Sequence, residues 1–331
     1  MPAPPSSPPT TEPPTGRPVG PSRLPGPRER AGGDPTTGPG RRAPVAPGVV
    51  VAVVAVAGIW AVWRGFVLSR TGRAADMGAL EGAEFGRNQL WTAAEQVLDV
   101  ISVPLLAAVL IATVLLAVLR RRVVLGVQVA LIMGGANLTT QVLKRWVLDR
   151  PDVGIDADHL VPSLPSGHTT AAASVAVALL LVVPRRLRPL TAVAGALYTV
   201  VTGVSTLVAG WHRPSDVVAA VLVVLAWAGV ASAVGALLDP AGRSVGKPGG
   251  DRPRRTATAI ATLLVAAGAT GAAAAVALER TVASVDDGLE AGRELVTAYA
   301  GGALGIAAVS CVCFATVLVL RRATEASRRR G

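Results

Sequence analysis

Eight long apolar runs constrain the fold of this chain more than any other feature. They lie at residues 47–68, 97–119, 123–144, 168–184, 189–210, 214–238, 257–277 and 297–320. About 20 apolar residues in helical form cross the hydrocarbon core of a bilayer. Helices also satisfy their own backbone hydrogen bonds in lipid. The sequence therefore predicts an all-α polytopic membrane bundle of about eight transmembrane helices.

The composition fits this prediction. Hydrophobic residues make up 51% of the chain and charged residues only 16%, and the formal net charge is +11. The basic residues stand in short clusters between apolar runs, without the basic surface and stacking aromatic residues that would indicate nucleic-acid binding. Many Ala, Val and Gly residues and few aromatic ones favour close helix–helix packing in lipid.

The loop charges predict the orientation in the membrane. Arg and Lys gather at 120–122, 185–188, 243–255 and 321–330, whereas the loops at 76–99 and 279–294 are acidic or mixed. Basic loops stay on the cytoplasmic side. We therefore expect a multi-pass protein of the cell membrane with both termini cytoplasmic. The loop at 145–167 and the turn at 211–213 then face the outer side.

The chain divides into three parts. Residues 1–46 contain more than half of the 25 prolines, together with many arginines, and predict a disordered cytoplasmic tail without the apolar core of a signal peptide. Residues 47–238 form a six-span core, and 239–331 add a cytoplasmic loop, two further spans and a basic tail. Both cysteines, Cys311 and Cys313, lie in the last apolar run and are expected to be buried apolar side chains.

Polar residues at the outer ends of spans are functional candidates, because charge at membrane depth is costly. In 137–151, Asn137, Gln141 and Lys144 share one helix face, and Arg150 follows near the expected helix end. Snorkelling toward water is the alternative interpretation of these cations. Basic residues on the outer side nevertheless oppose the charge bias of the loops, which favours a functional role.

A second cluster is Pro165-Ser166-Gly167-His168, at the start of an apolar run. Ser166 can cap the helix, and the free backbone N–H groups of a helix N-terminus attract anions. Gly167 allows a ligand to approach the backbone, and His168 adds a proton donor. A plain helix start with an interfacial histidine is the alternative.

The third cluster lies in residues 203–216, where His212 and Asp216 are four positions apart. On a helix this spacing sets the carboxylate beside the imidazole, where it fixes the tautomer and makes the second ring nitrogen more nucleophilic. A structural His–Asp pair that caps a helix is the alternative. All three clusters fall on one membrane face, and together they indicate metal-free phosphoryl transfer.

These residues resemble the motifs of the type 2 phosphatidic acid phosphatase (PAP2) superfamily of membrane enzymes, which read K-x6-R-P, P-S-G-H and S-R-x5-H-x3-D. The corresponding residues here are Lys144…Arg150-Pro151, Pro165-Ser166-Gly167-His168 and Ser205-Thr206…His212…Asp216. The resemblance assigns the six-span core to a PAP2-like fold that works without metal or other cofactor.

The resemblance also implies a role for each matching residue. His212 would be the nucleophile that forms a phosphohistidine, Asp216 would orient it, and His168 would protonate the leaving group. The phosphate oxygens would be bound by Lys144, Arg150, Ser166 and the Gly167 amide.

Two positions depart from the family pattern. Five residues instead of six separate Lys144 from Arg150, so that Arg145 is an alternative phosphate ligand. Thr206 stands where the family has arginine. Thr206 itself and Arg213, beside His212, are further candidate phosphate ligands, and Arg213 is a candidate replacement for the missing arginine. Such a loss could cost a few kcal/mol of transition-state stabilisation.

The function predicted from these features is a lipid phosphatase in the membrane. Its substrate would be phosphatidic acid, phosphatidylglycerol phosphate, or a polyprenyl phosphate or diphosphate. A lipid transporter and a catalytically weakened scaffold of the same fold are the alternatives, and the last two spans could pack on the core or mediate self-association. In the loop after Lys144, the group Asp149, Asp152, Asp156, Asp158 and His159 could suggest a metal site, but we expect a solvated loop. Pairing of Asp149 or Asp152 with Arg150 is a further alternative.

Overall fold

The computed structural model describes Met1, residues 45–99, 122–154, 163–239, 253–285, 288–289 and 292–329, and a few positions between 108 and 115. The predicted tail at 1–46 and the loop that begins the C-terminal part therefore lie almost entirely outside the described residues. So does most of the apolar run expected at 97–119.

The described residues form helices and connecting turns, with no strand among them. The helices are α1 (Ala46–Val62), α2 (Arg70–Gly82), α3 (Glu84–Asp99), α5 (Val123–Ala130), α6 (Ala136–Val142), α7 (Gly167–Val182), α8 (Arg188–Val208), α9 (Pro214–Leu238), α10 (Pro253–Ala283) and α11 (Gly292–Arg329). Wider π-helical turns extend or join some of them: η1 (Trp63–Val67), η2 (Leu131–Gly135) and η3 (Leu143–Val147). The expected all-α helical bundle is confirmed.

Six of these helical segments are long and apolar enough to cross a membrane: 46–67, 123–147, 185–208, 214–238, 254–283 and 292–325. The helix α7 is also apolar but shorter, at 16 residues. These seven segments coincide with seven of the eight predicted apolar runs. The segment at 69–99, which contains the predicted charged loop at 76–99, is instead largely helical in α2 and α3. The helix α2 begins where Ser69 Oγ accepts a hydrogen bond of 3.0 Å from the Gly72 amide, an N-cap that stabilises a helix start.

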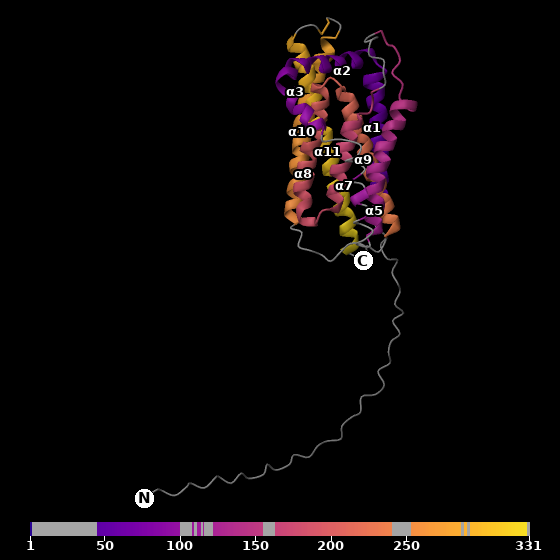
Figure 1. Cartoon of the computed structure of the whole chain (residues 1–331), viewed down its shortest axis with the longest axis vertical. Coiled ribbons are helices and arrows are strands. Elements are labelled where there is room, and N and C mark those ends of the chain that lie inside the picture. The colour runs from indigo at the N-terminus through magenta and orange to yellow at the C-terminus, as the bar shows by residue number, and fades with distance from the viewer. Residues whose placement is uncertain are drawn as a thin grey trace, which may run out of the picture. The chain divides into compact units, whose positions relative to one another are not determined.

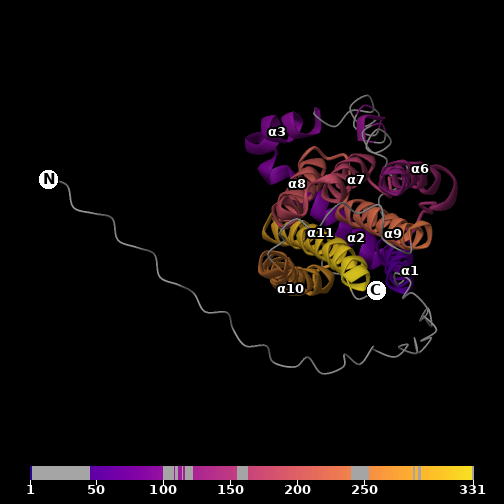
Figure 2. The same cartoon turned by 90° about the horizontal axis from the view of Figure 1, so that it is seen from below.

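The helix α9 lies at the centre of the bundle, between α1, α7 and α11 (Figure 2). Small residues let it pack closely. A Cβ added to Gly229 would lie 2.6 Å from the Gly48 carbonyl oxygen, so only glycine permits this approach of α1 to α9. Close backbone contact of this kind is how helices associate where lipid removes the hydrophobic driving force.

The two C-terminal helices belong to the same bundle. The helix α11 packs against α2, α8 and α9, and α10 packs mainly against α11. Phe314 of α11 is fully buried, and a Cβ added to Gly195 of α8 would lie 2.6 Å from its ring. The structure therefore shows these spans packed on the core, and self-association through them stays a prediction.

The connectivity brings the predicted polar clusters to one end of the bundle. The start of α1 and the end of α11 lie at one end, and α2 lies at the other (Figure 1). The end with α2 also receives the end of η3, the start of α7, the end of α8 and the start of α9, because consecutive spans run in opposite directions. At the opposite end, Arg185 and Arg188 form ion pairs with Glu325 of α11, at 3.2 and 2.6 Å.

Candidate active site at the start of α9

A tight turn between α8 and α9 forms the base of the site. The carbonyl of Thr206 accepts hydrogen bonds from the backbone amides of Trp211 and His212, at 3.0 and 3.3 Å. Gly210 has φ +72°, a left-handed conformation that a residue with a Cβ adopts only under strain. Pro214 then starts α9 at a position where no intrahelical N–H donor is needed. The turn therefore fixes where His212 sits relative to α9.

His212 and Asp216 form the predicted pair. Nδ1 of His212 lies 3.2 Å from Oδ2 of Asp216, and the same carboxylate oxygen accepts the backbone amide of Arg213 at 3.1 Å. The Asp216 side chain is fully buried, whereas that of His212 is about one tenth exposed. A carboxylate on Nδ1 directs the lone pair of the neutral imidazole to Nε2, which makes that nitrogen available as a nucleophile.

Two guanidinium groups lie beside this pair. Nη2 of Arg150 is 3.8 Å from Oδ1 of Asp216 and 3.4 Å from Oγ of Ser163. Nη1 of Arg213 donates to the same Ser163 oxygen at 3.3 Å, and its Nε contacts Sδ of Met77. Burial, and next the charge of Arg213, lower the pKa of Arg150, yet a guanidinium remains charged at any physiological pH. Two cations thus converge on one hydroxyl.

Arg150 is also incompletely bonded. Its Nη1 is buried and makes no hydrogen bond with any described residue. A buried donor without a partner is costly, and a guanidinium accommodates an anion by a planar, two-pronged contact. An oxyanion would supply the missing partner.

The start of α7 forms the opposite wall. The Ser166 amide donates to the Asp216 carbonyl at 2.9 Å, which ties α7 directly to α9, and Ser166 Oγ accepts the Thr169 amide at 3.4 Å. A Cβ added to Gly167 would meet only Nε2 of Gln141, at 3.9 Å. The space beside this helix N-terminus is therefore open, as an anion site there requires.

The remaining predicted residues border the same space. The His168 ring lies 5.3 Å from the Trp211 ring, centroid to centroid. His168 is also within electrostatic range of Lys144 and His212. Lys144 stands half-buried in η3, within electrostatic range of Asp216. The structure thus brings together residues from all three sequence clusters.

Two sequence-based alternatives are corrected. Asp149 and Asp152 are not the partners of Arg150 in the structure, because Arg150 pairs with Asp216. Asp152 instead accepts the Gly154 amide at 2.7 Å. Thr206, considered as a phosphate ligand, is fully buried and donates its hydroxyl to the Gly203 carbonyl at 2.7 Å. It therefore supports the turn from inside α8.

Sequence reasoning missed two groups at this site. Ser163 joins the two arginines, and Asp76 of α2 bonds Ser215 beside the His212–Asp216 pair. From the sequence alone, Asp76 is only one of several loop charges. The N-cap residue Ser69 and the amphipathic pattern after it could have indicated a helix there, but not its partner.

Comparison with known proteins assigns part of the chain. The model of the PAP2 superfamily matches residues 125–237, from α5 to the end of α9. No curated protein and no solved structure matches the chain. The matched segment contains Lys144, Arg150, His168, His212 and Asp216. Residues 125–237 of this chain are thus similar to the PAP2 superfamily, whose members include lipid phosphatases.

Proposed function

We propose that this protein is a membrane phosphatase that hydrolyses the phosphomonoester or diphosphate of a lipid through a phosphohistidine. The observation that carries the proposal is the His212–Asp216 pair beside two convergent guanidinium groups and an open helix N-terminus. The nucleophile, its orienting carboxylate and the cations that phosphoryl transfer requires are adjacent.

The chemistry proceeds in two steps. Nε2 of His212 attacks phosphorus, the N–P bond forms, and the bond from phosphorus to the leaving oxygen breaks while His168 donates a proton to that oxygen. Water then attacks the phosphohistidine, His168 removes a proton from the water, and the N–P bond breaks to release inorganic phosphate. Asp216 stabilises the positive charge that His212 develops. Lys144, Arg150, the Ser166 hydroxyl and the Gly167 amide hold the phosphoryl oxygens.

Arg213 takes the place of the arginine that the family motif has at position 206. Its guanidinium reaches the same hydroxyl as that of Arg150, so the second cation enters from the start of α9 instead of the end of α8. This supports an active enzyme over a weakened scaffold.

The proposed orientation rests on the loop charges, and the site chemistry limits the substrate to lipids that carry a phosphate or diphosphate. The Arg-rich end of the bundle, with Arg185, Arg188 and Arg321, would face the cytoplasm, and by the loop charges both termini would be cytoplasmic. The site would then work at headgroup level on the outer side. Phosphatidic acid, phosphatidylglycerol phosphate and polyprenyl phosphates or diphosphates all carry the required group.

The test is phosphate release from a panel of these lipids by the purified protein in detergent micelles. We expect His212→Ala to lower the rate by several orders of magnitude, and EDTA to leave it unchanged. In the wild type, a base-stable, acid-labile phosphoprotein should form that the variant lacks. Full activity of the His212→Ala protein would refute the mechanism. Lipid transfer between leaflets by that inactive variant would favour the transporter instead.

A further inference from the structure

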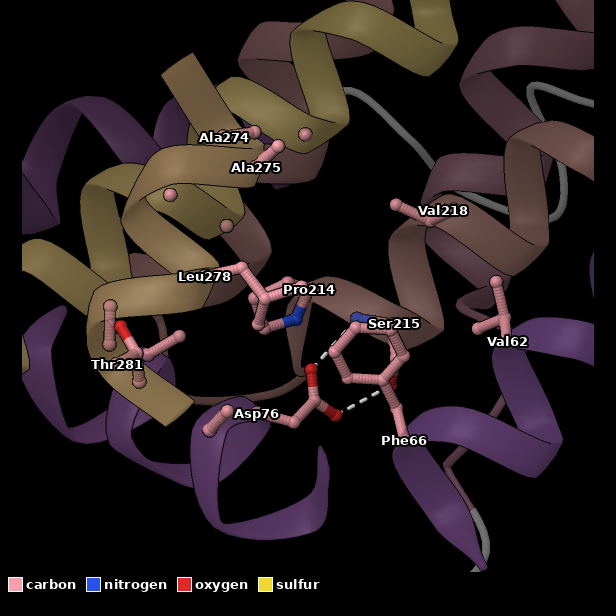
Figure 3. Close-up of a pocket in the computed structure, with 16 residues that line it drawn as sticks. Val62, Phe66, Asp76, Pro214, Ser215, Val218, Ala274, Ala275, Leu278 and Thr281 are labelled. Carbon is pink, nitrogen blue, oxygen red and sulfur yellow. Dashed lines mark hydrogen bonds between the residues drawn. The ribbon is translucent and has the colours of Figure 1, made fainter. Parts of the chain in front are cut away.

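The first turn of α9 is held by a carboxylate from outside the PAP2 segment. Asp76, on α2, accepts the Ser215 hydroxyl at 2.5 Å through Oδ2 and the Ser215 backbone amide at 3.0 Å through Oδ1 (Figure 3). Both residues are buried, and 139 positions separate them in the chain. The contact therefore adds a long-range restraint one residue away from Asp216.

The start of α9 needs this second acceptor. A helix N-terminus has N–H groups without intrahelical partners. Pro214 has no N–H group, and Asp216 accepts the backbone N–H group of Arg213 while it also bonds His212. The Ser215 amide would remain unpaired in a buried place without Asp76. Asp216 therefore bonds the histidine, and Asp76 bonds the first turn of the helix.

Neighbouring contacts reinforce the same turn. Met77, next to Asp76, contacts the side chain of Arg213. On the other side, a Cβ added to Gly302 of α11 would lie 2.5 Å from Cγ of Pro214, so α11 packs directly onto the start of α9. The catalytic turn is therefore enclosed by α2 and α11, neither of which belongs to the matched segment.

Asp76 also lies at the edge of a mostly apolar cavity of about 180 Å³. The cavity is bounded by α1, α2, α9, α10 and α11, with Val62, Phe66 and Leu278 among its lining residues (Figure 3). Burial, and next the charge of Asp216, raise the pKa of Asp76 to about 7. The charge of Asp216 raises the pKa of Asp76, and the charge of Arg213, just before α9, lowers it. The charge of Asp76 in turn opposes the lowering of the pKa of Arg150. The cavity lining contributes no other charged group.

We propose that Asp76 is a positioning residue for the reaction, which fixes the first turn of α9 and so aligns His212 and Asp216 with the arginines. The inference rests on the proposed function. It assigns the positioning to a helix that precedes the matched segment, and it predicts that loss of both acceptors lowers turnover.

The first experiment compares Asp76→Ala with Asp76→Asn. The alanine variant loses both acceptors, and a displaced catalytic group lowers kcat on the order of 10²-fold with little change in KM. The asparagine variant restores most of kcat, because its carbonyl accepts the Ser215 amide and its NH₂ group donates to the Ser215 hydroxyl. Glu84→Gln, an exposed carboxylate on α3, is the matched control and should leave kcat unchanged.

The second experiment uses pH, because only the wild type ionises at position 76. Above pH 7 the charged carboxylate opposes the positive potential of Arg150 and Arg213, which weakens their attraction for phosphate. We expect kcat/KM of the wild type, divided by that of Asp76→Asn, to fall between pH 6 and 8 with a midpoint near 7. A purely structural role would leave this ratio independent of pH.

The outcomes separate the two proposals. Absence of phosphate release by the wild type refutes the function. If the wild type is active, an Asp76→Ala protein with wild-type kcat overturns the positioning role. If Asp76→Ala fails to fold, as judged by gel filtration in detergent, the Asp76→Asn profile decides alone, and a flat ratio overturns the inference.

Discussion

Arg213 offers the sharpest test of how this site departs from the PAP2 motif. In Arg213→Met the side chain keeps much of its length, but it loses the guanidinium group that contacts Met77 and meets Arg150 at Ser163. The backbone amide of residue 213, which bonds Asp216, is unaffected. The change therefore removes one cation from the phosphate site and leaves the His–Asp pair in place.

The expected loss follows from the energy of one charged contact. A hydrogen bond to a charged group contributes about 1.5–3 kcal/mol, and each 1.36 kcal/mol is tenfold in rate. We therefore expect kcat/KM of Arg213→Met to fall about 10- to 150-fold, measured as phosphate release from phosphatidic acid in mixed micelles. Arg213→Lys should recover only part of this, because an ammonium keeps the charge without the planar fork.

Two further variants make the test specific. Arg145→Met removes an exposed cation at the same end of the bundle, and it should change kcat/KM much less. Thr206→Arg, added to Arg213→Met, should not restore activity, because position 206 is fully buried in α8 and overpacking destabilises a core. If Arg213→Met stays within twofold of the wild type, or if Thr206→Arg rescues it, the assignment of Arg213 as the replacement cation is wrong.

Three other variants probe the orienting carboxylate, the anion site and the packing. Asp216→Asn should lower kcat on the order of 10⁴-fold, as loss of the orienting aspartate does in serine proteases, and single-turnover kinetics would show whether formation of the phosphohistidine is the slowed step. Gly167→Leu would fill space at the start of α7 without a clash at Cβ. We therefore expect KM to rise and inhibition by inorganic phosphate to weaken, while thermal stability is kept. Gly229→Ala would force a Cβ against the Gly48 carbonyl and should destabilise the bundle by about 1–3 kcal/mol, seen as a lower Tm in detergent. An unchanged Tm would mean that α1 and α9 separate easily.

Hydropathy alone is sufficient to predict most of this fold. Lipid admits few structures other than helices, so that apolar runs and their charged ends translate directly into spans. Hydropathy does not predict the helices in the charged segment at 69–99, because α2 and α3 are too polar to be recognised as spans. Only their helical pattern of polar and apolar residues could indicate them.

The site was predictable as far as its chemistry is local in sequence. His212 and Asp216 are one helical turn apart, and Ser166 to His168 occupy a helix start, so spacing alone suggests their geometry. Arg150 was harder, because its loop offered nearer aspartates as partners and only the fold brings Asp216 to it. The direction of the Arg213 side chain depends in the same way on Met77 and Ser163.

The turn at the start of α9 depends on contacts with helices that are distant in the sequence, and a sequence motif does not include such contacts. A motif describes residues that react or bind, and these tolerate little change in type. A helix start needs only an acceptor for its free amides, and this acceptor can come from any element that packs nearby. Here α2 supplies it through Asp76, and α11 closes the other side against Pro214. The same reactive residues can therefore be held by different surroundings, and in this chain the surroundings should control turnover through the start of α9.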